Sequence, residues 1–307
     1  MPKALVLSGG GPLGVAWQAG LAVGLARSGV QLAEADLIVG TSAGSVVGAQ
    51  LALGKEMGQL LAQVEHFWAG QERSAGDSGA AGGAGTAGSS AAIAERMQTL
   101  LSLMADATTS GEGIPAETRA ALGRFALQAD AGPEARFAGA FAFLAGEAWP
   151  ARFRCTAVDA ESGSFVVWDG RAGESLDRAV ASSCAVPGIF PPVTVRGRPY
   201  IDGGMRSGTN ADLAQGNDRV LIVTLVGTAG AAAGPQNPVE ERFRVRLEAE
   251  QAALTGAGAR VRVVGPDEKA TAVMGLNMMD ASLGPAAAEA GTMQGETLAA
   301  ELAGFWD

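Results

Sequence analysis

One stretch decides how this chain folds: Leu37-Ile38-Val39-Gly40-Thr41-Ser42-Ala43-Gly44-Ser45-Val46-Val47. Its first three residues are apolar and predict a buried strand, and the small residues after Ser42 predict a helix. Glycines at 40 and 44 allow a sharp turn there, because a Cβ at either position would collide with a strand or with the helix start. Such a turn exposes a serine hydroxyl, so Ser42 is a candidate nucleophile; the alternative is a tight turn without chemistry.

Strands and helices alternate on both sides of this stretch. Apolar runs predict strands at residues 4–7, 153–158, 165–168, 200–202, 219–226 and 261–264. Helical spacing predicts helices at residues 13–27, 43–53, 56–69, 174–184, 239–254 and 286–302 and over most of 91–148. The uncharged core of 219–226 predicts a central parallel strand. This alternation predicts an α/β layered fold.

The composition limits the class of protein. The 307 residues are 48% apolar, which suits a folded core that needs no metal or disulfide. The formal net charge of −10 argues against nucleic-acid binding, because phosphate recognition needs clustered cations. Cys155 and Cys184 lack the spacing of a zinc site or a disulfide framework. The N-terminal apolar run is too short for a signal peptide, so we expect a cytoplasmic protein.

Two long uncharged stretches, 37–54 and 220–239, contain glycines or prolines and predict buried strands with turns rather than membrane spans. Residues 74–90 are almost wholly Ala, Gly and Ser, which predicts a flexible insertion or the hinge of a lid.

A serine nucleophile needs a base to take its proton. The single histidine, His66, lies on a predicted amphipathic helix, where surface or core positions are more common than catalytic ones. A carboxylate can replace it when it is within hydrogen-bonding reach and shielded from water. Asp202, followed by two glycines, is our candidate base, although Asp-Gly-Gly is also a common turn.

Four short motifs follow one another along most of the chain, each weak when taken alone. They are Ser8-Gly9-Gly10-Gly11-Pro12-Leu13-Gly14, Gly40-Thr41-Ser42-Ala43-Gly44, Ala181-Ser182-Ser183-Cys184-Ala185-Val186-Pro187 with Phe190-Pro191-Pro192, and Asp202-Gly203-Gly204 followed by Asn210. Their order and their placement after predicted strands make the set specific. Together they resemble the patatin-like phospholipase family.

The resemblance implies a three-layer sandwich with a central, mostly parallel sheet and a helical insertion at about 91–148, in one domain over residues 1–307. It implies a serine acyl hydrolase of the lipase, esterase or phospholipase A type, in which Ser42 attacks a carboxylic ester and Asp202 is the base. The implied oxyanion hole uses backbone amides of Gly9, Gly10 and Gly11, with Ala43 as a further donor. Leu13 stands where the family often carries a basic residue, which argues against a preference for anionic head groups.

The expected partner is a lipid or small ester, with at most transient, peripheral membrane contact, and we expect neither cofactor nor metal. The Met and Phe residues of 91–148 either pack in the core or form a helical cap that faces an acyl chain. The sequence leaves the head group, the acyl-chain length and the oligomeric state open.

Two other functions fit parts of the sequence. Gly9, Gly11 and Gly14 after a strand match the dinucleotide fingerprint of a Rossmann-like oxidoreductase, with Glu34 and Asp36 about the expected distance further on. In that fold the acid closes the second strand, whereas both acids here precede the predicted strand. The other alternative is a non-catalytic member of the patatin-like fold that only binds acyl chains.

Overall fold

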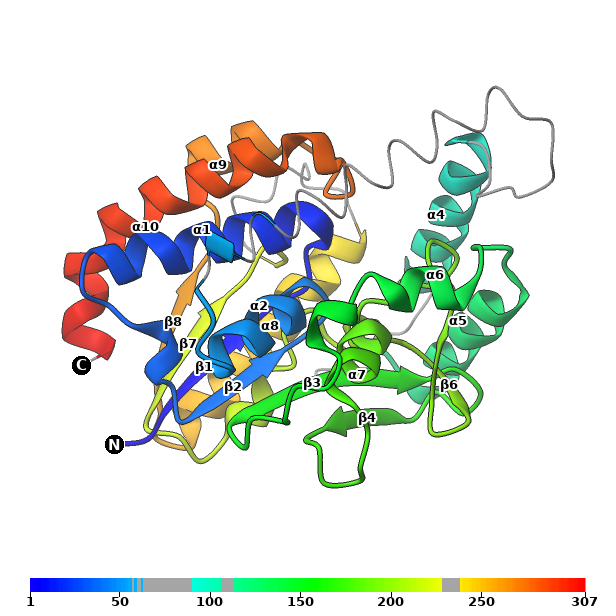
Figure 1. The fold of residues 1–307 in the computed structure, drawn as a ribbon, viewed down its shortest axis with the longest axis horizontal. Helices are drawn as coiled ribbons and strands as arrows, with labels where there is room; N and C mark the ends of the chain where they lie inside the picture. Colours follow the sequence, from blue (N-terminus) through cyan, green and yellow to red (C-terminus); the bar gives the residue numbers. More distant parts are fainter. Residues whose placement is uncertain (57, 60–61, 63–89, 106–112, 228–237, 307) are drawn as a thin grey trace.

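The computed structural model describes residues 1–56, 58–59, 62, 90–105, 113–227 and 238–306. Within them, eight strands form one mixed sheet (Figure 1). In chain order these are β1 (Lys3–Leu7), β2 (Leu37–Gly40), β3 (Phe153–Asp159), β4 (Phe165–Trp168), β5 (Val193–Val195), β6 (Arg198–Asp202), β7 (Arg219–Val223) and β8 (Arg260–Val264). The order across the sheet is β5-β6-β3-β2-β1-β7-β8, and β4 pairs with β3 outside this path.

Helices flank this sheet (Figure 1). The described helices are α1 (Gly11–Arg27), α2 (Ala43–Ala52), α4 (Ser90–Ala105), α5 (Ala116–Gln128), α6 (Glu134–Gly139), α7 (Leu176–Ser183), α8 (Pro238–Gly256), α9 (Glu268–Met274) and α10 (Gly284–Trp306). Short 3₁₀ turns are η1 (Leu32–Glu34), η2 (Ala142–Leu144), η3 (Gly203–Met205), η4 (Ala211–Ala214) and η5 (Ala281–Leu283).

The first strand shows how the layers arise. Leu7 belongs to the core that includes Leu13 of α1, whereas Val6 belongs to a separate core with Leu247 of α8. Successive side chains of a strand point to opposite faces, so β1 serves both cores. The three-layer α/β sandwich that the sequence predicts is therefore confirmed.

The sheet is parallel at its centre and antiparallel toward one side. β1 pairs in parallel with β2 and β7, β2 with β3, and β7 with β8. The pairings of β3 with β4, β3 with β6 and β5 with β6 are antiparallel. The prediction that the run after Arg219 forms a central parallel strand is confirmed, because β7 lies between β1 and β8.

Strand β3 brings two distant strand ends together. Cys155 pairs with Gly40 of β2 on one edge and with β4 on the other. Ala157 pairs with Asp202 of β6 and likewise with β4. A strand has only two edges, so β2 and β6 occupy successive parts of the same edge of β3. The carboxyl ends of β2 and β6 therefore meet, two positions apart along β3.

Helix α10 packs closely along α1, the helix that begins at the glycine motif (Figure 1). A Cβ built on Gly20 would lie 2.1 Å from the Ala288 carbonyl oxygen, and one on Gly24 would lie 2.1 Å from that of Thr292. Glycines thus allow the two helix backbones to touch, and α10 braces α1 against the sheet.

Several sequence predictions fall partly or wholly outside the residues that the structure describes. The predicted helix at 56–69 lies mostly outside the described residues, as do His66 and all but the end of the 74–90 stretch. Residues 91–148 contain most of α4 together with α5, α6 and η2. None of the described helices combines the length and the apolar character needed to cross a membrane.

Candidate active site

Ser42 joins β2 to α2 in a strained backbone conformation. Its φ of 52° and ψ of −120° are rare for a residue that carries a side chain. Glycines make the turn fit, because a Cβ at Gly40 would lie 2.5 Å from the Cα of Ser45 and one at Gly44 would lie 2.1 Å from the Leu7 carbonyl oxygen. The flanking glycines are therefore required by close packing against the helix start and β1.

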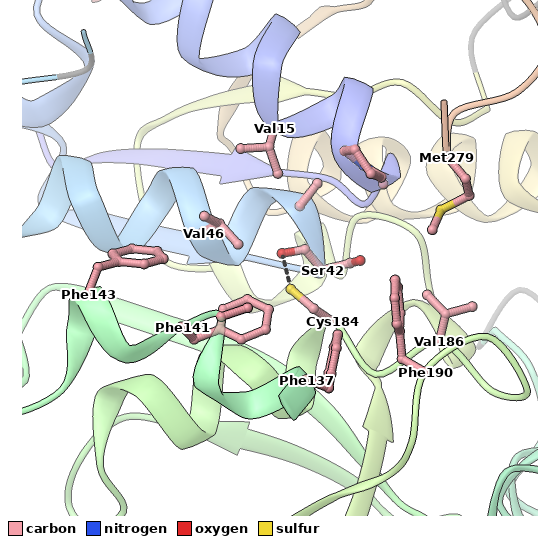
Figure 2. A pocket seen from close by; sticks show the side chains of 14 residues that line it. Val15, Ser42, Val46, Phe137, Phe141, Phe143, Cys184, Val186, Phe190 and Met279 are labelled. Atoms are coloured by element: carbon pink, nitrogen blue, oxygen red, sulfur yellow. Dashed lines mark hydrogen bonds between the residues drawn. The ribbon is translucent and has the colours of Figure 1, made fainter. Parts of the chain in front are cut away.

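Hydrogen bonds from the 181–187 motif hold this turn. The Ser42 amide donates to the Ser183 Oγ at 2.9 Å. The Ser42 carbonyl oxygen accepts from the Cys184 thiol at 3.3 Å (Figure 2) and from the Ser45 hydroxyl at 2.6 Å. No role for Ser183 could be predicted from the sequence, since the motif alone does not tell which side chain reaches the turn.

Asp202 lies at the end of β6 and is only 2% exposed. Its amide donates to the Ala185 carbonyl oxygen at 3.0 Å, and its Oδ1 accepts from the Gly204 amide at 2.7 Å. Burial raises the pKa of Asp202 to about 7, although hydrogen bonds from the Ser42 side chain and the Gly204 amide act in the opposite direction. The structure thus brings together Ser42 and Asp202, which are 160 positions apart in the sequence.

The glycine motif lies against the serine turn. The Ser8 carbonyl oxygen accepts from the Gly44 amide at 2.9 Å. The Gly9 amide donates to the Gly208 carbonyl oxygen at 3.0 Å. Among the described residues, the amides at 10, 11 and 43 have no hydrogen-bond partner, and they lie at the N-terminal ends of α1 and α2. Free amides at helix N-termini favour a negative charge.

An apolar pocket that is partly open to solvent lies beside Ser42 (Figure 2); its empty space is about 670 Å³ when the open solvent at its mouth is counted. Its described lining contains one hydroxyl, that of Ser42, and one thiol, that of Cys184; its other side chains are apolar. Burial raises the pKa of the Cys184 thiol far above its usual range, so the thiol stays protonated. The described lining of the pocket therefore offers an uncharged, apolar surface to a ligand.

Aromatic side chains from the region before β3 form one wall of this pocket. Phe137 stacks on Phe190 with ring centroids 4.5 Å apart and meets Phe141 edge-on at 5.4 Å. Phe137 and Phe141 are also buried, so they serve both as core residues and as pocket lining. Met279, from the segment between α9 and η5, lines the pocket as well and was missed, because no motif surrounds it.

The structure separates the acids of the dinucleotide fingerprint from the glycine motif. The Asp36 Oδ2 accepts from the Lys3 amide at 2.7 Å, at the start of β1. The glycine motif follows the other end of the same strand. Asp36 therefore lies near the N-terminal end of β1, whereas the glycine motif follows its C-terminal end. Within the described part of the chain, no cluster of His, Cys, Asp or Glu is arranged to hold a metal ion.

Comparison with known families agrees with this arrangement. The model of the family described as patatin-like phospholipase matches residues 5–214, more than half of the chain. This chain belongs to the patatin-like phospholipase family. The matched region of this patatin-like chain contains both Ser42 and Asp202. Met279 lies beyond that region.

A solved structure of the type III effector protein ExoU is similar to this patatin-like chain, with 16% sequence identity and a TM-score of 0.35. The match covers 96% of this chain and 53% of ExoU, so the chain spans about half the length of that structure. No curated protein matched the sequence.

Proposed function

We propose that this protein is a serine acyl hydrolase that cleaves carboxylic esters of lipids through a dyad of Ser42 and Asp202. The observation that carries the proposal is the buried carboxylate of Asp202 next to a serine hydroxyl on a strained, glycine-flanked turn. Family membership supports the lipid ester as substrate. The proposal treats the whole chain as one domain, since β7 and β8 extend the sheet that carries the dyad.

In the proposed reaction, the Ser42 Oγ attacks the ester carbonyl carbon while Asp202 takes the hydroxyl proton. The tetrahedral intermediate collapses when the alcohol leaves with that proton, and an acyl-serine remains. Water then attacks the acyl group with Asp202 again as base; the Ser42 Oγ leaves and takes that proton back from Asp202, which releases the carboxylic acid and restores the hydroxyl. A pKa of about 7 suits this role, because the carboxyl can both accept and return a proton near neutral pH.

The negative charge of the tetrahedral oxygen needs donors that are already in place. The free amides of Gly10, Gly11 and Ala43 lie in the loop and helix start around Ser42 and suit this role. Each such donor contributes on the order of 3 kcal/mol to acyl transfer. The Gly9 amide donates to the Gly208 carbonyl oxygen at 3.0 Å, so the proposal leaves Gly9 out of the oxyanion hole.

The acyl chain occupies the apolar pocket in this proposal. Burying each CH₂ group there is worth about 0.8 kcal/mol. The lining carries no charged side chain among the described residues, which favours an uncharged ester over one whose charged group lies near the serine. Membrane contact would then serve to deliver the substrate from a lipid phase.

The test is hydrolysis of p-nitrophenyl esters of several chain lengths by the wild type, Ser42→Ala and Asp202→Asn. We expect both variants to lose at least about a thousandfold in kcat/KM. Ser162→Ala, in the turn after β3, is the matched control and keeps full activity. A fluorophosphonate probe should label Ser42, as read from the mass of the labelled peptide, and not Ser45.

Each alternative has its own outcome. Wild-type inactivity at every chain length, or full activity of either dyad variant, would contradict the dyad. Tight binding of fatty acids without turnover would favour the non-catalytic binder. Binding of a nicotinamide cofactor to the purified protein would favour the oxidoreductase.

A further inference from the structure

The two dyad residues lie on strands that do not pair with each other, so their separation needs a direct link. We propose that Asn210 is a positioning residue that fixes this separation, and that Arg206 holds its amide in the required orientation. The inference rests on the proposed function, because it concerns the geometry of the same dyad.

The Asn210 side chain bridges the residues next to both dyad members. Its Nδ2 donates to the Thr41 Oγ1 at 3.0 Å, and Thr41 directly precedes the nucleophile. The same nitrogen lies 3.3 Å from the Gly203 carbonyl oxygen, and Gly203 directly follows Asp202. The Ser207 carbonyl oxygen, at 2.8 Å, and the Thr156 Oγ1, at 3.4 Å, also accept from this nitrogen, so its two hydrogens are shared among four acceptors. One amide group thus ties the β2 turn to the β6 turn.

The region around this bridge is buried and closely packed. Asn210 is fully buried, and the Thr41 Oγ1 also lies 3.0 Å from the Thr156 Oγ1 of β3. A Cβ on Gly203 would lie 2.2 Å from that Thr156 oxygen. Side chains in this region have no room to adopt another arrangement, so a lost hydrogen bond cannot be replaced by water without moving the turns.

Arg206 decides which way the amide faces. Its Nη1 donates to the Asn210 Oδ1 at 2.9 Å. A flipped amide would turn its oxygen toward the Ser207 and Gly203 carbonyl oxygens and its NH₂ group toward the guanidinium, which repels both ends. Arg206 in turn donates to both carboxylate oxygens of Asp212, at 3.0 and 2.6 Å. A bidentate pair of this kind holds the guanidinium plane in one orientation.

Helix α8 also holds the loop that contains Asn210, through the side chain of Glu250. Glu250 is 1% exposed, and it accepts from the Ser207 Oγ at 2.7 Å, from the Thr209 hydroxyl and from the Ala211 amide at 3.0 Å. These contacts fix the backbone on both sides of Asn210. Glu250 lies outside the region that the family model matches, so this anchor is supplied by the C-terminal part of the chain.

Asn210 does not line the pocket, so its loss should affect the chemical step rather than substrate binding. The test compares kcat and KM of the wild type, Asn210→Asp and Arg206→Gln for one p-nitrophenyl ester. Asn210→Asp keeps the size and the acceptor toward Arg206 but removes both N–H donors. We expect kcat to fall about a hundredfold in Asn210→Asp and about tenfold in Arg206→Gln, with KM within about twofold of the wild type.

Asn217→Asp is the matched control, because the Asn217 side-chain amide donates to the Ala214 carbonyl oxygen and, among the described residues, forms no hydrogen bond with the dyad. It should keep the wild-type kcat. Labelling by the fluorophosphonate should slow in parallel with kcat, since it reports the reactivity of Ser42 without an acyl-chain subsite. If melting curves show that Asn210→Asp does not fold, Arg206→Gln carries the test.

If the wild type is active and a folded Asn210→Asp variant keeps full kcat, the positioning role alone is overturned. If Asn210→Asp does not fold, full kcat in Arg206→Gln has the same meaning. A raised KM at unchanged kcat would overturn it as well. A wild type that hydrolyses no ester would overturn the proposed function, which is a separate result.

Discussion

Ser42 and Asp202 come from two differently built parts of the sheet. Ser42 follows β2 in the parallel part, and its turn is set by glycines pressed against β1 and the start of α2. Asp202 ends β6 in the antiparallel part, and its place is set by pairing with β3 and by burial under the 181–187 motif. The turn of the proposed nucleophile therefore depends on steric fit around its flanking glycines, whereas the proposed base depends on long-range strand pairing and on a low-dielectric environment.

The steric side of this comparison gives the largest expected effect. Gly44→Ala places a Cβ 2.1 Å from the Leu7 carbonyl oxygen, so β1 and α2 must move apart. We expect the free energy of unfolding in urea to fall by at least about 3 kcal/mol. Gly304→Ala, at a position in α10 with open space around it, is the control and should change stability by about 1 kcal/mol or less. A fully stable Gly44→Ala protein would contradict the steric account.

Burial of the base predicts how activity varies with pH. Asp202 acts as a base only when ionised, and its pKa is about 7. We therefore expect kcat/KM to rise about tenfold per pH unit below that value and to level off above it, so that activity at pH 5 is about a hundredfold below the plateau. A pH profile of p-nitrophenyl ester hydrolysis measures this. A flat profile between pH 5 and 8 would mean that Asp202 is not the base.

The same burial predicts that the ionised form of Asp202, which the proposed reaction needs, lowers the stability of the folded protein. Because the folded-state pKa of Asp202 lies above the usual value of 3.8, the stability that its protonated form contributes below pH 4 is lost as pH rises through about 7. Asp202→Asn removes the buried charge, so at pH 8.5 we expect it to be more stable than the wild type by about 2 kcal/mol. At pH 3.5, where the carboxyl is largely protonated in both the folded and the unfolded state, the two should melt at nearly the same temperature. If Asp202→Asn is less stable than the wild type by the same amount at both pH values, burial does not disfavour the ionised carboxylate of Asp202.

The smallest expected effect concerns an ion pair in the antiparallel part. Arg198 of β6 lies 2.9 Å from the Asp159 carboxylate of β3, but its side chain is 53% exposed. We expect Arg198→Ala to lower the free energy of unfolding by less than about 1 kcal/mol and to leave kcat unchanged. Urea denaturation with parallel kinetics checks both. A loss above about 2 kcal/mol would mean that this ion pair, rather than backbone pairing, holds β6 in place.

Sequence patterns predict some of the residues that form the pocket and the serine turn, but not all of them. The recurring aromatic residues around Phe137 predict either core packing or a cap that faces an acyl chain; Phe137 is buried and also lines the pocket beside Ser42. Met279 gave no signal, because nothing near it in the sequence marks a site. Ser183 lay inside a recognised motif, but only the folded chain shows that its hydroxyl accepts from the Ser42 amide.

The sequence by itself determined the α/β layering and the sharp strand-to-helix turn at Ser42, because both follow from local patterns: apolar runs for buried strands, and glycines where a Cβ has no room. Only the tertiary structure decided that Asp202 meets Ser42. That encounter requires β2 and β6 to share one edge of β3, a pairing between residues far apart in the sequence. Hydrogen bonds between distant strands leave no periodic trace in either segment, so sequence spacing cannot reveal them.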